Sequence, residues 1–83
     1  MIQIMVMYDI SVDRTRNKVA DTCKDYGLDR WQYSVFAGRL SKRQLRALTK
    51  ELRHLIENDA SILIVQLASD DWEKRIALGG CPA

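Results

Sequence analysis

The sequence has few of the residues from which small proteins build covalent or metal-held frameworks. Its 83 residues include two cysteines, one proline and one histidine. Cys23 and Cys81 are too few for a disulfide framework and too far apart for a zinc site. The one histidine, His54, falls on the polar side of an expected helix with no partner in view, which argues against a histidine general base. Any hydrolytic chemistry would therefore need a metal to generate the nucleophile from water.

Several motifs and targeting signals are also missing from the sequence. It contains no glycine-rich phosphate loop, no Cys-x-x-Cys pair and no nucleophile elbow. No apolar run approaches the ~18 residues of a membrane span. The N-terminus lacks the basic region and small-residue cleavage site of a signal peptide. We therefore expect a cytoplasmic protein with no membrane partner.

The composition is that of an ordinary globular domain, with an uneven distribution of charge. Hydrophobic residues make up 47% and charged residues 29% of the chain, and this length predicts one domain over residues 1–83. A chain this short buries only about 60% of its unfolded surface, so oligomerisation would help it. The net charge is only +2. However, six basic residues lie between positions 39 and 53 against one acid, Glu51, which favours a polyanion or an acidic protein as partner.

Hydrophobic periodicity predicts a strand over residues 2–9. Its alternation places Ile4, Val6 and Tyr8 on one face, with Met5 and Asp9 on the other. Ser41 and Gln44 form a capping-box pattern at the start of a helix. In chain order, the further expected elements are a helix over 13–26 ended by a glycine, two short strands within 28–40 that break near 32–34, a helix from 42 ended by 57–59, a strand over 61–67, a helical turn over 72–75 and a short strand over 76–78.

This order of elements predicts a ferredoxin-like fold. The class is α+β: a βαββαβ chain with an antiparallel sheet and helices on one face, plus a short C-terminal strand. The uncovered face of the sheet would show Met5 and Met7. A bare apolar face on so short a chain favours a dimer contact over a solvent surface. We therefore predict a homodimer, in which the tail strand could add to the partner's sheet edge.

Asp9 ends an apolar strand, where it gains nothing from packing. It either caps the following turn or helix, or it holds a metal. A two-fold axis beside Met5 and Met7 would bring two Asp9 carboxylates together, and they would repel unless a proton or a cation lay between them. Mg²⁺ suits such a site because it accepts one or two carboxylates and keeps several waters. Both interpretations remain open from the spacing alone.

Arg16 and a group of aromatic residues are the other candidates. Arg16 falls in the first turn of a helix, where the helix dipole disfavours a cation. Its partner could be Asp9, a phosphate or an ordinary ion-pair acid. Tyr8, Arg30, Tyr33 and Phe36 combine rings with a guanidinium, which suits either stacking on bases or core packing.

The spacing of several short motifs resembles one protein family. The motifs are Tyr8-Asp9-Ile10, Arg16-x-Lys18-Val19-Ala20, Tyr26-Gly27-Leu28 and Arg30-x-Gln32-Tyr33-Ser34-Val35-Phe36-x-Gly38. In order and spacing they are similar to the small CRISPR-associated spacer-acquisition protein, the second of the two core adaptation proteins. The resemblance runs through residues 2–40 and continues more loosely to the C-terminal region.

The resemblance implies a ferredoxin-like homodimer in which Asp9 from each subunit flanks a divalent metal, with Mg²⁺ the expected ion. It also implies a metal-dependent endonuclease acting on RNA or double-stranded DNA. Family members serve in addition as the central dimer that bridges subunits of the CRISPR integrase. The positions that the family implicates in function, and that we take as catalytic candidates, are Tyr8, Asp9, Arg16, Lys18, Arg30 and Phe36.

Two functional hypotheses follow. In the first, paired Asp9 residues bind Mg²⁺ for phosphodiester cleavage while Arg16 and Lys18 hold phosphates. In the second, the dimer is a non-catalytic scaffold that grips duplex DNA and docks the integrase. The candidate nucleic-acid-binding residues are Arg14, Arg16, Lys18, Arg39, Arg43, Arg46, Lys50 and Arg53.

Overall fold

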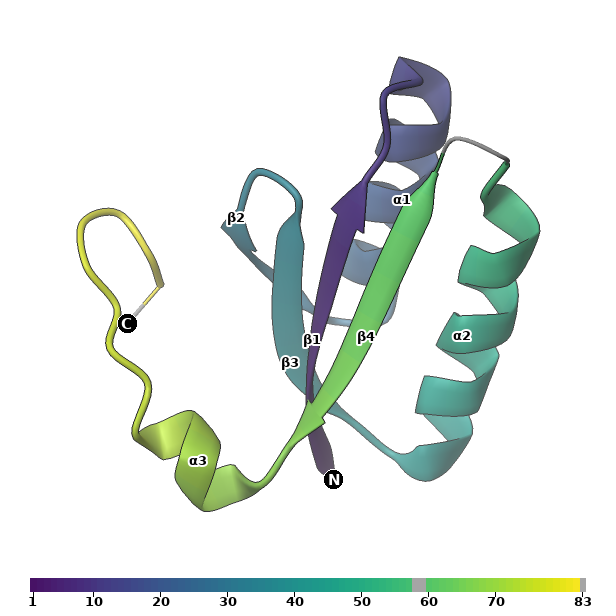
Figure 1. The fold of residues 1–83 in the computed structure, drawn as a ribbon. Helices are drawn as coiled ribbons and strands as arrows, with labels where there is room; N and C mark the ends of the chain where they lie inside the picture. Colours follow the sequence, from purple (N-terminus) through teal and green to yellow (C-terminus); the bar gives the residue numbers. More distant parts are fainter. Residues whose placement is uncertain (58–59, 83) are drawn as a thin grey trace.

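A four-stranded antiparallel sheet forms the centre of the computed structural model, which describes residues 1–57 and 60–82 (Figure 1). The strand order is β2-β3-β1-β4, so β1 (Ile2–Asp9) is an inner strand with a neighbour on each side. The other elements are α1 (Asp13–Asp25), β2 (Asp29–Gln32), β3 (Val35–Leu40), α2 (Lys42–Leu55), β4 (Ser61–Leu67) and α3 (Ser69–Glu73). This arrangement confirms the predicted ferredoxin-like α+β fold.

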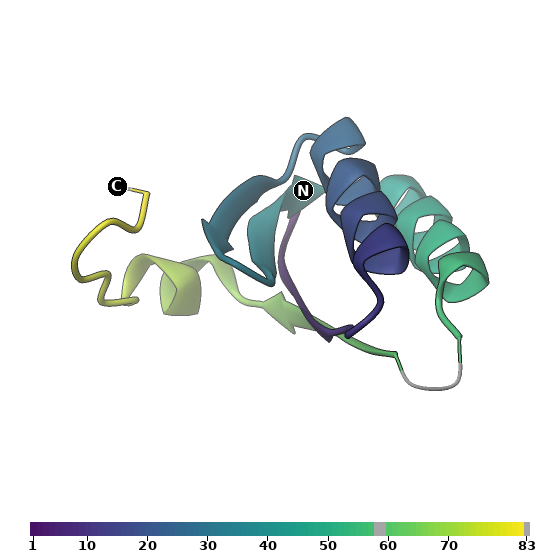
Figure 2. The ribbon, with the colours of Figure 1, turned by 90° about the horizontal axis from the view of Figure 1, so that it is seen from above.

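The two long helices lie side by side on one face of the sheet (Figure 2). The core between the layers contains Ile4 and Val6 from β1, Phe36 from β3, and Leu48 from α2, all with no exposed surface. The predicted alternation of β1 is therefore confirmed, because the residues two apart in this strand are those that the helices cover.

Local signals at two helix ends also agree with the sequence. The Gln44 backbone N–H donates to the Ser41 hydroxyl at 3.1 Å, and the Ser41 N–H donates to the Gln44 side-chain oxygen at 2.9 Å. This is the predicted capping box. After α1, Gly27 adopts a φ of 81°, a left-handed conformation that favours glycine. The predicted end of the second helix over 57–59 lies partly outside the described residues, and α2 itself ends at Leu55.

The other face of the sheet is largely apolar and has no helix layer. The register places Met5 between Ala37 and Val65, and Met7 between Val35 and Leu63. Leu63 is 59% exposed. We call this surface the open face. It carries Gln3, Met5, Met7, Asp9, Val35, Ala37, Arg39, Ser61, Leu63, Val65 and Leu67.

The tail after β4 differs from the prediction. Helix α3 begins at Ser69, earlier than the expected turn over 72–75, and residues 76–78 form no strand within the single chain. Figure 1 shows the reason: α3 carries the tail away from β4 and toward β2, so the tail lies along no free edge of its own sheet. Ile76 is 86% exposed as a result.

An aromatic clamp holds the tail in this position. The Trp31 and Trp72 rings meet edge to face, with centroids 5.2 Å apart. The Arg75 guanidinium lies 4.4 Å from the Trp72 centroid and 5.2 Å from the Trp31 centroid. Cation–π contacts of this kind stabilise a tail that otherwise packs little. An apolar hollow of about 350 Å³ remains between the tail and the sheet, with Met5 in its wall.

None of the helices in the described part of the chain combines the length and the apolar character needed to span a bilayer.

The buried thiol of Cys23 should make stability depend on alkaline pH. Burial raises the pKa of this thiol from 9.0 to about 11, so the unfolded chain ionises first as the pH rises. The free energy of unfolding should therefore fall by about 1.4 kcal/mol per pH unit between pH 9 and 11 from this group. Urea unfolding from pH 8 to 11 measures this, with Cys23→Ala expected to show a shallower decline. The partly exposed Cys81 supplies the control, and Cys81→Ala should retain the wild-type slope.

Candidate active site

Asp9 lies at the end of β1 on the open face, opposite Ser61. Its side chain is exposed and has no hydrogen bond or ion pair with the residues described. The N-cap of α1 is Val12, whose side chain cannot cap. The geometry therefore does not support the capping interpretation for α1, and it leaves the Asp9 carboxylate free to accept a ligand.

The Asp9 carboxylate could serve as a ligand for a hard divalent cation. A carboxylate is the type of oxygen ligand that Mg²⁺ accepts, alone or with a second one, while the ion keeps several waters. Within residues 1–57 and 60–82 of one chain, no three His, Cys, Asp or Glu side chains gather as a metal site would. Asp9 can thus be one protein ligand, and a further carboxylate would have to come from another molecule.

Arg16 stabilises the loop that follows Asp9. Its Nη1 donates to the carbonyl oxygen of Ile10 at 3.1 Å, and its Nη2 pairs with the Asp13 carboxylate. The guanidinium also lies 5.5 Å from the centre of the Tyr33 ring. The hydrogen bond to Asp13 raises the pKa of Arg16. The partner of Arg16 is therefore Asp13 rather than Asp9, and its contacts restrain the chain that leaves β1.

Tyr8, Arg30 and Phe36 are together, but on the helix side of the sheet. The Tyr8 and Phe36 rings stack with centroids 6.4 Å apart, and the Arg30 guanidinium lies 5.1 Å from the Phe36 centroid. Phe36 has no exposed surface, so no base could stack on it. Its placement matches the core-packing alternative. The ring in this region that a base could reach is Tyr33, which is 68% exposed.

The Tyr8 hydroxyl is an unusual feature of this group. It is buried and has no hydrogen-bond partner among the described residues. Burial raises the pKa of Tyr8, while the nearby Arg30 acts in the opposite direction. Tyr8 and Asp9 are adjacent in the sequence but point to opposite faces of the sheet. The structure therefore places the two residues on opposite faces, as the predicted alternation requires, although the family resemblance implicates both in function.

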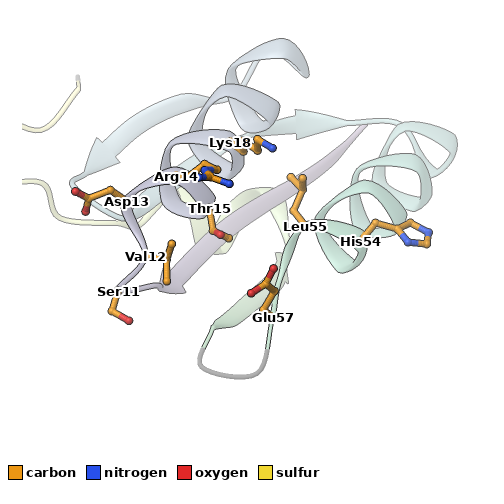
Figure 3. Close-up of a pocket in the computed structure, with 9 residues that line it drawn as sticks. All are labelled: Ser11, Val12, Asp13, Arg14, Thr15, Lys18, His54, Leu55 and Glu57. Atoms are coloured by element: carbon orange, nitrogen blue, oxygen red, sulfur yellow. The ribbon is translucent and has the colours of Figure 1, made fainter.

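Arg14 and Lys18 line a polar hollow of about 730 Å³ between the two helices (Figure 3). Its walls come from the loop after β1, the start of α1 and the end of α2. Nothing in the linear sequence indicates that the end of α2 lies here, because the packing of α1 against α2 creates the hollow. The lining residues are Ser11, Val12, Asp13, Arg14, Thr15, Lys18, His54, Leu55 and Glu57.

The remaining basic candidates fall into two places. Arg39 on β3 pairs with Gln3 of β1, so its register directs it to the open face. Helix α2, which carries the other four, covers the opposite face (Figure 2). The eight predicted nucleic-acid residues therefore form several surfaces and not one. The four on α2 are Arg43, Arg46, Lys50 and Arg53.

Comparison with known protein families assigns this chain to one of them. The family model described as CRISPR associated protein Cas2 matches residues 1–75. The chain belongs to the Cas2 family. This assignment confirms the family resemblance that we inferred from the sequence motifs.

Individual Cas2 relatives and solved structures agree with the assignment. A Chloroflexus aurantiacus protein named CRISPR-associated endoribonuclease Cas2 is 45% identical over 88% of this chain and 87% of its own length. A crystal structure of a hypothetical protein from Thermus thermophilus superposes with a TM-score of 0.85 at 32% identity, covering 99% of this chain and 95% of the other. A chain in a structure titled as a partial Cas6-RT-Cas1–Cas2 complex has a TM-score of 0.77 at 26% identity, covering 99% and 96%.

The sequence hypothesis missed Asp13, and it grouped Tyr33 with the aromatic candidates without indicating its contact with Arg16. Asp13 holds Arg16, and the three-residue spacing on a helix was a usable signal for that pair. Tyr33 lies against Arg16 from the turn between β2 and β3. No sequence pattern could have indicated that contact, because it depends on how the hairpin folds over α1.

Replacing Arg16 by lysine should loosen the loop after β1. A lysine ammonium cannot bond the Ile10 carbonyl and the Asp13 carboxylate with the planar geometry that arginine offers. We expect Arg16→Lys to lower the midpoint of urea unfolding measurably, because the hydrogen bonds to Ile10 and Asp13 are weakened. The exposed Arg14, two residues earlier, is the matched control, and Arg14→Lys should be neutral within error. Equal effects of the two variants would contradict this role for Arg16.

Proposed function

We propose that this chain is a CRISPR adaptation protein that works as a homodimer and cleaves RNA or double-stranded DNA with a divalent metal. The observation that carries the proposal is the free Asp9 carboxylate at the end of β1. Further support comes from the endoribonuclease name of the Chloroflexus relative at 45% identity.

The homodimer part of the proposal rests on the open face. Its apolar side chains have no helix layer, and the clamped tail covers mainly the part near Met5, Val35 and Leu67. Leu63 remains 59% exposed on the same face as Asp9. A two-fold contact there would bury this surface against itself and bring the second Asp9 toward the first.

In this proposal, each part of the chain has a defined task. The two Asp9 carboxylates hold and orient the metal, and Arg16 fixes the loop that follows each of them. Mg²⁺ bound there would supply the activation of a water molecule for attack on a phosphodiester. Lys18 and Arg14, on the adjoining start of α1, would hold phosphates near the loop. Tyr8, Arg30 and Phe36 would act from the far side of the sheet by positioning β1.

A second function is supported by one specific comparison. The neighbour in the structure titled as a partial Cas6-RT-Cas1–Cas2 complex aligns over 99% of this chain. On that basis we propose that the dimer also docks the CRISPR integrase Cas1 and bridges its subunits. This scaffold role requires the dimer but does not require the Asp9 chemistry.

Removing the Asp9 charge tests the nuclease proposal. Asp9→Asn should reduce Mg²⁺-dependent cleavage of single-stranded RNA or duplex DNA at least about 100-fold, because a carboxamide binds a divalent cation poorly. Gel assays with and without EDTA measure this, and Asp21→Asn on the exposed face of α1 is the charge-matched control. Undiminished cleavage by Asp9→Asn would refute the nuclease mechanism. Wild-type protein that assembles with the integrase but does not cleave would leave only the scaffold role.

A lysine on the open face tests the homodimer. Leu63 is already exposed in the single chain, so Leu63→Lys should leave the fold intact while placing an ammonium in the proposed interface. The dimer dissociation constant should rise by at least about 100-fold, since an unpaired buried charge costs several kcal/mol. Sedimentation velocity measures the shift. Val12→Lys, at an exposed apolar position in the loop after β1, should sediment as the wild type; if Leu63→Lys does so too, the open face is not the interface.

A further inference from the structure

The Arg16 side chain reaches back from α1 to the end of β1. Its Nη1 donates to the carbonyl oxygen of Ile10, the residue directly after Asp9. The backbone N–H one residue before Asp9 donates to the carbonyl oxygen of Ser34 at 3.1 Å, so the turn between β2 and β3 lies alongside this strand end. Tyr33 of that turn contacts the guanidinium with its ring. Arg16 therefore lies between the loop that follows Asp9 and the neighbouring turn.

The other two cations at the start of α1 point elsewhere. In Figure 3, Arg14 and Lys18 extend from one side of α1, toward the hollow between the two long helices, and Asp13 extends from the other side. Asp13 is the residue that pairs with Arg16, and Arg16 does not line the hollow. A phosphate at the end of β1 would therefore meet Arg16, whereas one in the hollow would meet Arg14 and Lys18.

The contacts of Arg16 are of two kinds. The Ile10 carbonyl and the Tyr33 ring are neutral groups that hold the guanidinium in place, and the Arg16 side chain is only 21% exposed. The third contact is the charged one, and its Asp13 side chain is 82% exposed. Ion pairs with an exposed carboxylate are weak because water competes for the charges. Asp13 can therefore leave Arg16 while the two neutral contacts keep the guanidinium in position.

The position of the Asp13 carboxylate also suits a phosphate. A guanidinium binds carboxylate and phosphate oxygens with the same planar geometry. Asp13 is the first residue of α1, and Val12 before it provides no side-chain cap. The N-terminal end of a helix attracts anions, phosphate groups included. Both causes that stabilise the carboxylate here would stabilise a phosphate oxygen in its place.

We infer that Asp13 is an internal competitor, which occupies Arg16 until a nucleic-acid phosphate beside Asp9 displaces it. Asp13 is thus a positioning residue that acts through Arg16 and contacts no substrate. In the free chain its carboxylate neutralises the cation, so a phosphate must bind strongly enough to replace the carboxylate. The inference rests on the proposed function in taking a phosphodiester as the ligand at the end of β1.

Removing the charge of the competitor tests the inference. Asp13→Asn keeps the size of the side chain but weakens its hold on Arg16. Binding to a fluorescent 12-base RNA and to a 20-base-pair DNA duplex is followed by anisotropy in EDTA at 150 mM NaCl, which excludes cleavage. Kd should fall about threefold for at least one of the probes, the change expected when an exposed ion pair no longer has to be broken. Asp13→Glu keeps the carboxylate and should bind as the wild type.

Two further variants separate competition from general charge. Asp21→Asn removes an equal charge from an exposed position farther along α1, and its Kd should stay within about 1.5-fold of the wild type. In an Arg16→Gln background, Asp13→Asn should give no gain, because the cation that it releases is absent. Urea unfolding of each variant is measured in parallel. Asp13→Asn should bind more tightly although its urea midpoint does not rise, a combination that a purely structural role would not produce.

Each outcome is decisive for the competitor role. An unchanged or raised Kd of Asp13→Asn for both probes would overturn the inference. An equal gain in Asp21→Asn, or a gain that persists in the Arg16→Gln background, would overturn it too, since either would be a general effect of charge. The nuclease proposal fails separately, through undiminished cleavage by Asp9→Asn. The threefold gain from Asp13→Asn should remain when it is combined with Asp9→Asn, because binding is measured without metal.

Discussion

Strand β1 has hydrogen-bonded neighbours on both edges, β3 on one side and β4 on the other. Its side chains can therefore only alternate between the helix layer and the open face. Val6 and Tyr8 enter the core, while Met7 and Asp9 remain on the open side. The core, the open face and the position of the free carboxylate all depend on this one alternation. The helices add stability by covering the first set, and they leave the second set available for contacts with other molecules.

The parts of the fold that were predictable are those that local physics determines. The alternation over residues 2–9 and the capping box at Ser41 needed no knowledge of the tertiary structure. Residues 76–78 form no strand in the single chain, because a strand there depends on a free sheet edge, and that depends on where α3 directs the chain. The contact of Arg75 with Trp31 joins residues that are more than forty positions apart in the sequence. Such a contact has no periodic signature.

The candidate site shows the same division between local and tertiary information. Asp9 was recognisable as a carboxylate that packing does not explain. The N-cap of α1 is Val12, so Asp9 does not have the capping role at α1 that competed with metal binding. The alternation of β1 predicted that Tyr8 and Asp9 lie on opposite faces, but the sequence could not show that Arg30 would lie on the same side as Tyr8, against Phe36. It likewise could not show that the basic residues divide among α1, the open face and α2. Shared charge or a shared motif indicates a common type of ligand, but only the layers of the fold determine which residues can touch it together.

The opposite orientations of Tyr8 and Asp9 have a consequence for how this chain can diverge. A single-residue insertion or deletion inside β1 would turn every following side chain of the strand to the other face. The free carboxylate would enter the core and the tyrosine would reach solvent, so one event would destroy both surfaces. The tail after β4 has no alternation between two sheet faces that an insertion could reverse, because residues 76–78 belong to no strand of the single chain. Changes of length should therefore accumulate at the C-terminus over evolutionary time, while the distance from residue 2 to residue 9 stays fixed.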